Sequence, residues 1–256
     1  MKLNCLFISL ILSSICCSPA AKSFSFIFCN DVHLGCSTND PDLFSKALRQ
    51  IESEKSDFVI IAGDLTCNGK MEEFSKMDSL LSRSRKKFRL LPGNHDVDCN
   101  NEGQKNYLSK FNDQASSYMF IHKNVCFMML DLSDCGRAHV KIDSSHIRWI
   151  ASSLKNVDPG IPIVIITHFP LSPNTPKFTV EGTADLLSAL ENRNILGFLS
   201  GHYHGHFSDS INGVPYLTNV SLMPNVENFS NDPGKGYLQV LIRDQKIITE
   251  FREIAY

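Results

Sequence analysis

Five short groups of carboxylate, amide and imidazole side chains occur along the chain, each directly after a run of apolar residues. They are Asp31-x-His33, Gly63-Asp64, Gly93-Asn94-His95-Asp96, Thr167-His168 and Gly201-His202-x-His204. Carboxylate oxygens combined with imidazole nitrogens suit divalent metals of borderline softness. Asp64 can bridge two ions with its two oxygens, and the glycine before it leaves room for that approach. The pattern therefore predicts a dinuclear metal site.

Such a site indicates hydrolysis of a phosphate ester. Two ions about 3.5–4 Å apart bind a phosphoryl group, generate hydroxide near neutral pH and stabilise both the attacking and the leaving oxygen. We expect a hydroxide that bridges the ions to be the nucleophile. His95 follows the candidate ligand Asn94 and is not needed as a ligand, so its imidazole can meet the substrate and protonate the leaving alkoxide. Asn94 and His95 are therefore both predicted to contact the substrate.

The elements that must position these groups can be read from the apolar periodicity. Buried strands are predicted at 24–28, 58–62, 88–91, 126–132, 161–166 and 195–199. Helical spacing of apolar residues predicts helices at 40–51, 70–84 and 144–154, an alternation typical of α/β layering. Because the ligands follow strand ends, we expect them to converge on one edge of one sheet. Alternating strands at 206–211, 214–220, 237–242 and 246–253 are predicted to complete the fold as a second sheet layer.

Length and composition favour one ordinary globular unit. The chain has 256 residues, a formal net charge of −2 and 43% hydrophobic residues. A single domain can reach this length, so we expect residues 22–256 to form one domain. The composition gives no support for a basic nucleic-acid-binding surface.

The first 21 residues are interpreted as a signal peptide. Lys2 provides a positive start, residues 6–15 are almost wholly apolar, and Ser18-Pro19-Ala20 offers a cleavage site. The apolar run is short for a membrane span, which needs about 20 residues. The protein is therefore predicted to be exported, either periplasmic or secreted. A retained N-terminal anchor, or a lipid on Cys16 or Cys17, are the alternatives that would bring membrane contact.

Six cysteines follow this segment, which in an oxidising compartment permits up to three disulfides whose pairing the sequence does not fix. They are Cys29, Cys36, Cys67, Cys99, Cys126 and Cys135. Cys29 and Cys126 lie within apolar runs and are predicted to be buried thiols.

The five groups resemble the calcineurin-like metallophosphoesterase family in order, spacing and glycine flanks, from residue 24 to the end of the chain. The resemblance implies a two-layer mixed β-sandwich flanked by helices (α/β, or α+β in some schemes) and two ions from manganese, iron or zinc. It assigns the first ion to Asp31, His33, Asp64 and His204. It assigns the second ion to Asp64, Asn94, His168 and His202. His95 matches the general acid of the family.

At two positions after the second group, Cys67 and Asn68, this chain differs from some branches of the family. Protein Ser/Thr phosphatases place there an acidic residue that orients the acid histidine and an arginine that grips phosphate, whereas this chain has Cys67 and Asn68. Purple acid phosphatases place a tyrosine ligand at the position of Cys67, so no purple centre is expected. Residues 63–69 and 92–96 look most similar to the class III cyclic-nucleotide phosphodiesterase-like branch. The group that orients His95 is left open.

The sequence does not separate the possible substrates, which are small phosphate esters. Phosphomonoesters, cyclic or linear phosphodiesters, nucleotide pyrophosphates and nucleic acids all stay open, as does the oligomeric state. The walls of the site are predicted at 99–117, 137–142 and 169–180, and His139 in the second of these is a further candidate substrate contact. The competing hypothesis is a non-catalytic metal-binding or protein-interaction module on the same fold. The complete set of ligand residues favours the enzyme.

Overall fold

The computed structural model describes residues 23–100, 102–111 and 115–256, so the predicted signal segment lies outside the described residues. Two mixed sheets form the centre of the molecule. The first contains, in spatial order, β11 (Lys246–Glu253), β10 (Gly236–Arg243), β1 (Phe24–Cys29), β2 (Val59–Ala62) and β3 (Phe88–Leu91). The second contains β4 (Tyr118–His122), β5 (Val125–Met129), β6 (Ile163–Ile166), β7 (Ile195–Ser200), β9 (Val214–Thr218) and β8 (Phe207–Ile211).

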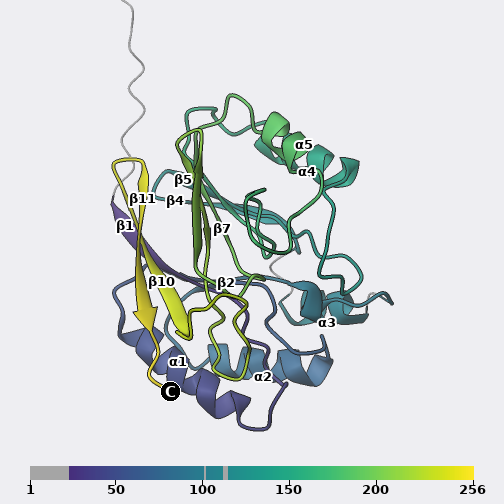
Figure 1. Ribbon diagram of the computed structural model, residues 1–256, viewed down its shortest axis with the longest axis vertical. Helices are drawn as coiled ribbons and strands as arrows, with labels where there is room; N and C mark the ends of the chain where they lie inside the picture. Colours follow the sequence, from purple (N-terminus) through teal and green to yellow (C-terminus); the bar gives the residue numbers. More distant parts are fainter. Residues whose placement is uncertain (1–22, 101, 112–114) are drawn as a thin grey trace, which may run out of the picture.

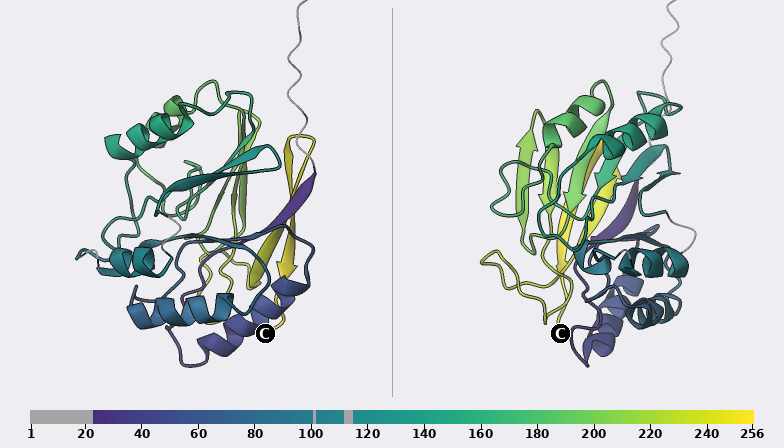
Figure 2. Two further views of the ribbon diagram at one scale, coloured as in Figure 1. Left: turned by 180° about the vertical axis from the view of Figure 1, so that it is seen from behind. Right: turned by 90° about the vertical axis from the view of Figure 1, so that its right-hand side faces the viewer.

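The two sheets pack face to face, and helices cover their outer faces (Figure 1). The first sheet carries α1 (Asp40–Ser53), α2 (Met71–Leu81) and α3 (Glu102–Lys110). The second carries α4 (Ser144–Leu154) and α5 (Thr183–Ala189). Seen from behind, the two groups of helices again lie on opposite sides of the sheets (Figure 2). The predicted β-sandwich flanked by helices is therefore confirmed.

Alternation along β1 explains why the sheet is buried on both faces. Phe26 and Phe28 point into the core between the sheets, where they join Phe127 of β5 and Leu199 of β7. Ile27, between them in sequence, joins the core beneath α1 and α2. Because successive side chains of a strand point to opposite faces, one apolar run supplies two cores.

Strand direction places the ends of the central strands together. β1, β2 and β3 are parallel to one another, as are β5, β6, β7 and β9. The prediction that all ligands follow strands of one sheet is wrong, because β1 to β3 and β6 to β7 belong to different sheets. The C-terminal strands also do not form a layer of their own: β8 and β9 extend the second sheet, and β10 and β11 extend the first.

Most element boundaries agree with the sequence predictions, and the helix at 144–154 agrees at both ends. The short helix α5 was not predicted, because its seven residues carry too little apolar periodicity to be distinguished from a loop. In the part of the chain that the structure describes, no helix is long and apolar enough to span a bilayer.

Candidate metal centre

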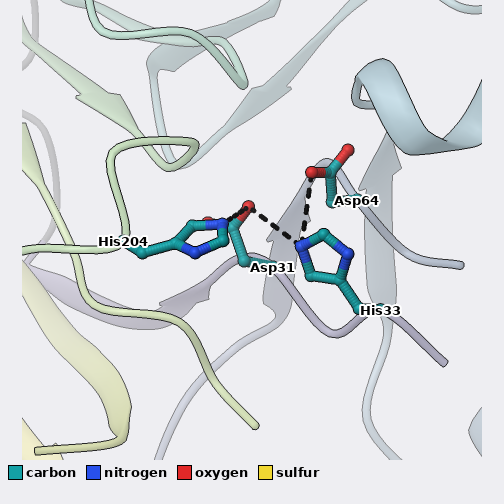
Figure 3. Close-up of side chains that lie close together, drawn as sticks. All are labelled: Asp31, His33, Asp64 and His204. Carbon is teal, nitrogen blue, oxygen red and sulfur yellow. Dashed lines mark ion pairs between the residues drawn. The ribbon is translucent and has the colours of Figure 1, made fainter. Parts of the chain in front are cut away.

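Asp31, His33, Asp64 and His204 meet where β1, β2 and β7 end, and they offer ligand atoms within 4.8 Å of one another (Figure 3). Nε2 of His204 lies 3.0 Å from Oδ1 of Asp31, and Nε2 of His33 lies 3.4 Å from Oδ2 of Asp64. All four side chains are buried. This set is the one assigned to the first ion from the sequence.

Asp64 also belongs to a second group, with His168 and His202. The same Oδ2 atom that faces His33 lies 3.3 Å from Nε2 of His168. Asn94 completes this side, because its Oδ1 lies 3.3 Å from the same His168 nitrogen. The structure therefore brings together all seven candidate ligands, with Asp64 between the two groups.

The backbone around these side chains is strained. Five of the seven candidate ligands adopt positive φ, at values between 45° and 61°: Asp31, His33, Asp64, His202 and His204. A non-glycine residue in this left-handed region costs roughly 1–2 kcal/mol. Such strain concentrates at functional sites, where the surrounding structure must hold it in place. The cluster therefore indicates a site whose geometry is maintained at the expense of stability.

Backbone carbonyls fix the orientation of three of these imidazoles. Nδ1 of His168 donates to the Ala62 carbonyl at 3.0 Å, Nδ1 of His204 donates to the Glu227 carbonyl at 2.7 Å, and Nε2 of His202 donates to the Ala138 carbonyl at 2.8 Å. In His168 and His204 the other ring nitrogen, Nε2, faces the carboxylates of Asp64 and Asp31. Metal-binding histidines are held in the same way, with the second nitrogen fixed by a hydrogen bond.

The electrostatics of the centre keep both carboxylates ionised and two of the four candidate-ligand imidazoles neutral, whereas the pKa values of His168 and His204 are raised. Burial alone would raise the pKa of Asp31 and of Asp64, but neighbouring histidines hold both pKa values below their usual range. Burial lowers the pKa of His33 and of His202 to about 4, so both rings are neutral near neutral pH. Burial acts in the same direction on His168, but Asp64 beside it raises its pKa to about 9. Ionised carboxylates and neutral imidazoles are the forms that bind metals, so an ion bound by His168 would displace a proton from its ring.

One buried atom shows that the donor set fits a metal ion. Nε2 of His33 is buried and has no hydrogen-bond partner among the described residues, although it points toward two carboxylates. A buried polar atom without a partner costs about 1–3 kcal/mol. An ion between His33, Asp31 and Asp64 would satisfy this nitrogen.

Two glycines are required by close approach. A Cβ on Gly63, which has φ of +85°, would overlap the ring of His168, and a Cβ on Gly93 would overlap the side chain of Asp64. From the sequence, the absent side chain of Gly63 is predicted to leave room for a metal ion. The structure shows that the ring of His168 occupies this space.

Asp96 is a positioning residue, a role that the sequence pattern does not predict. Its carboxylate is fully buried and accepts hydrogen bonds from the amides of Leu65, Thr66 and Gly93 and from the Thr66 hydroxyl, at 2.7–2.9 Å. These bonds join the loop that carries Asp64 to the loop that carries Asn94. An acidic residue next to two candidate site residues was the available sequence signal.

His95 lies at the open side of the centre. Its side chain is exposed, its ring stands edge-on to His33 with centroids 4.6 Å apart, and its backbone N–H donates to Oδ1 of Asp64 at 2.9 Å. Nδ1 of His95 donates to the backbone carbonyl of Cys67 at 3.0 Å. The group that orients His95 is therefore a carbonyl of the residue that replaces the usual acidic partner.

Two phenylalanines form an aromatic rim beside the candidate ligands. Phe178 has φ of +60°, and its ring centroid lies 4.5 Å from that of His202. The ring of Phe229 stacks on that of His204, with centroids 5.3 Å apart. The two phenylalanine rings lie 5.3 Å apart, and Phe229 is 40% exposed. His139 is exposed and lies 5.6 Å from Phe178, so it belongs to this rim rather than to either ligand group. Phe178 lies in a predicted wall segment, whereas Phe229 was not predicted.

The sequence pattern of calcineurin-like phosphoesterases matches residues 24–206 of this protein. The chain belongs to the calcineurin-like phosphoesterase family. It is a phosphoester hydrolase, and its two groups of candidate ligands agree with the dinuclear metal dependence of this family.

Similar proteins support this assignment. A probable glycerophosphodiester phosphodiesterase, GpdQ, from Arcobacter nitrofigilis is 25% identical over 175 residues, which cover 65% of this chain and 63% of that protein. A 3',5'-cyclic-nucleotide phosphodiesterase from Nostoc sp. is 23% identical over 205 residues, which cover 75% of each chain. A dimetal phosphatase from Danio rerio has the same fold, with a TM-score of 0.71, 15% identity, and coverage of 91% of this chain and 96% of that one.

Proposed function

We propose that this calcineurin-like phosphoesterase is an exported phosphodiesterase that acts on small phosphodiesters. Asp31, His33, Asp64 and His204 would hold one ion, and Asp64, Asn94, His168 and His202 the other. When bound, the two ions, from manganese, iron or zinc, supply the nucleophile and the stabilisation of charge on phosphate. Asn94 and His95 contact the substrate, and His95 protonates the leaving oxygen.

The observation that carries the preference for diesters is the position of Asn68. This residue occupies the place of the phosphate-gripping arginine, yet its side chain donates to Oε1 of Glu73 at 3.1 Å and its backbone N–H donates to the same carboxylate at 2.9 Å. A doubly charged monoester gains most from a bidentate arginine, whereas a singly charged diester needs it less. The names of the Arcobacter and Nostoc relatives, both phosphodiesterases, point in the same direction.

Export is proposed from the signal-like first 21 residues and is supported by two disulfides. Cys36 is bonded to Cys67, and Cys99 to Cys135, while Cys29 and Cys126 are buried free thiols as predicted. Structural disulfides persist mainly in oxidising compartments.

A substrate panel tests the proposed activity. We expect purified protein loaded with manganese, zinc or iron to hydrolyse bis-p-nitrophenyl phosphate with a kcat/KM at least about tenfold above that for p-nitrophenyl phosphate, because Asn68 stands at the position of the phosphate-gripping arginine. Release of p-nitrophenol measures both rates. A preference for the monoester would contradict the proposal, as would metal-loaded protein that hydrolyses neither ester.

The aromatic rim favours diesters that carry a planar group, such as a nucleoside, over glycerol diesters. A base stacked on an aromatic side chain gains about 1–3 kcal/mol. We expect Phe229→Ala to raise KM for a cyclic nucleotide about five- to tenfold or more, with little change for a glycerol diester such as glycerophosphocholine, which carries no planar group, when both are measured by steady-state kinetics. Ile248→Ala is a matched control, since Ile248 is 42% exposed on β11 and lies outside the rim. An equal rise in KM for both substrates would show that the rim does not recognise the planar group of the substrate.

A further inference from the structure

We propose that the Cys36–Cys67 disulfide positions the backbone carbonyl that orients His95, so that protonation of the leaving group depends on this bridge. The inference rests on the proposed function, in which His95 is the general acid. Cys36 and Cys67 do not touch the reacting atoms and act through the His95 ring.

The hydrogen bond to Cys67 determines which nitrogen of His95 faces the substrate. Since a carbonyl only accepts, Nδ1 must carry the hydrogen that it donates at 3.0 Å, and Nε2 is left to hold the proton for the leaving oxygen. Among the described residues, no other hydrogen bond holds this exposed ring. The location of one carbonyl oxygen therefore sets the direction in which Nε2 points.

The bridge lies where the backbone pairing of the two supporting loops ends. The segments after β1 and β2 run side by side, with Val32 N–H donating to the Asp64 carbonyl at 2.9 Å and Leu34 N–H to the Leu65 carbonyl at 3.1 Å. Cys67 N–H donates to the Leu34 carbonyl at 3.1 Å, which is the last backbone hydrogen bond between these two segments among the described residues. The disulfide joins Cys36 to Cys67 at this point, with their Cα atoms 5.2 Å apart.

This arrangement replaces a side-chain contact with a backbone contact. In the protein Ser/Thr phosphatases of the family that the sequence resembles, an acidic side chain at this position orients the histidine. Here the side chain of Cys67 is used by the disulfide, and the carbonyl of the same residue makes the contact with His95. Without the bridge, Cys67 would lose the covalent tie to the loop that carries Asp31 and His33. The carbonyl would then hold Nδ1 less firmly.

The expected consequence depends on the leaving group. In the hydrolysis, a hydroxide formed when water loses a proton to solvent bonds to phosphorus, and the ester P–O bond breaks with its electron pair on the departing oxygen. That oxygen takes the proton from Nε2 of His95, and solvent returns a proton to the ring. A strongly basic leaving group needs this proton as it departs, whereas a weakly basic one leaves as a stable anion. A displaced His95 should therefore slow hydrolysis of esters with basic leaving groups much more than of activated esters.

Two substrates that differ only in the leaving group test this. Methyl p-nitrophenyl phosphate has a weakly basic leaving group and methyl phenyl phosphate a more basic one. The measured quantity is the ratio of kcat for methyl p-nitrophenyl phosphate to kcat for methyl phenyl phosphate. We expect Cys36→Ser/Cys67→Ser to raise this ratio by on the order of tenfold or more, because a small misplacement of a catalytic group costs up to about a hundredfold in rate. The ratio does not depend on the fraction of active protein, so partial misfolding does not obscure it.

The second disulfide supplies a matched control. Cys99→Ser/Cys135→Ser removes a bridge of similar sequence separation, 36 against 31 residues, and should leave the ratio at the wild-type value. In that control background, reduction with a phosphine opens only the Cys36–Cys67 bridge in protein that has already folded, and should raise the ratio. Cys36→Ser/Cys67→Asp, which restores an acidic residue, should lower the ratio again.

A ratio that stays unchanged when the Cys36–Cys67 bridge is removed overturns the inference. So does an equal rise in the Cys99→Ser/Cys135→Ser protein, since the effect would then be general loosening. Failure of the wild-type enzyme to hydrolyse either diester would be a different result: it would overturn the proposed function itself.

Discussion

The Asp64→Asn variant should lose both metal ions and nearly all activity. Asp64 is the one residue shared by the two groups of candidate ligands, and its Oδ2 lies 3.4 Å from the His33 nitrogen and 3.3 Å from the His168 nitrogen. A neutral amide removes the charge that would balance both ions. Since bound metals contribute several kcal/mol to the transition state, we expect kcat/KM to fall about a thousandfold or more.

Asparagine is the appropriate replacement because it tolerates the positive φ of 48° at this position better than other side chains do. The backbone and the packing should therefore survive the change. Metal content measured by elemental analysis and kcat/KM measured with bis-p-nitrophenyl phosphate check the expectation. Asp131→Asn is the control, because Asp131 is a buried carboxylate after β5 that belongs to neither group. Full metal content in Asp64→Asn would refute the shared role.

The sequence predicts which side chains come together at the candidate centre, because each lies next to a strong local signal. The runs before Asp31, Asp64 and His168 are apolar on both faces, as expected for central parallel strands, and the carboxyl ends of such strands collect functional groups. What the sequence does not contain is the order of strands in space. The assumption of one sheet was wrong because pairing between strands distant in the chain is set by packing of the whole core, not by any local pattern.

The contacts that orient the histidines cannot be predicted from the sequence, because backbone groups make them. Ala62, Cys67 and Ala138 each act through a backbone carbonyl, a group that every residue possesses. Nothing in the identity of an alanine indicates that its carbonyl accepts a hydrogen bond from an imidazole. The sequence could show that Cys67 replaces an acidic residue, but only the structure shows that the same residue still contacts His95.

The disulfide pairing and the aromatic rim could not be predicted either, because both depend on how loops approach each other in the folded chain. Six cysteines allow many pairings, and the choice of Cys36 with Cys67 depends on how the loops after β1 and β2 approach each other. Phe178 and Phe229 lie 51 positions apart in loops without periodicity, so no local pattern pairs them, although their ring centroids are 5.3 Å apart. Loop geometry decides these features, and it follows from the completed fold.

His95→Ala should separate binding of the phosphate from protonation of the leaving group. Its side chain is exposed, lies beside His33 and belongs to neither group of candidate ligands, so the variant should keep its metal content. General acid catalysis contributes about 10²–10⁴-fold. We expect kcat for methyl phenyl phosphate to fall by about this factor, and kcat for methyl p-nitrophenyl phosphate to fall far less.

The change in the ratio of kcat values in His95→Ala also sets the upper limit for the change caused by removing the Cys36–Cys67 disulfide. A misplaced imidazole cannot reduce the rate more than an absent one does. His146→Ala is the control, since His146 lies on α4, where it caps the helix start with Asp143, outside the metal centre. An equal loss on both diesters in His95→Ala would assign His95 to substrate binding rather than to acid catalysis. In that case the carbonyl of Cys67 would orient a binding group, and the dependence on the Cys36–Cys67 bridge should appear in KM instead of in the ratio of kcat values.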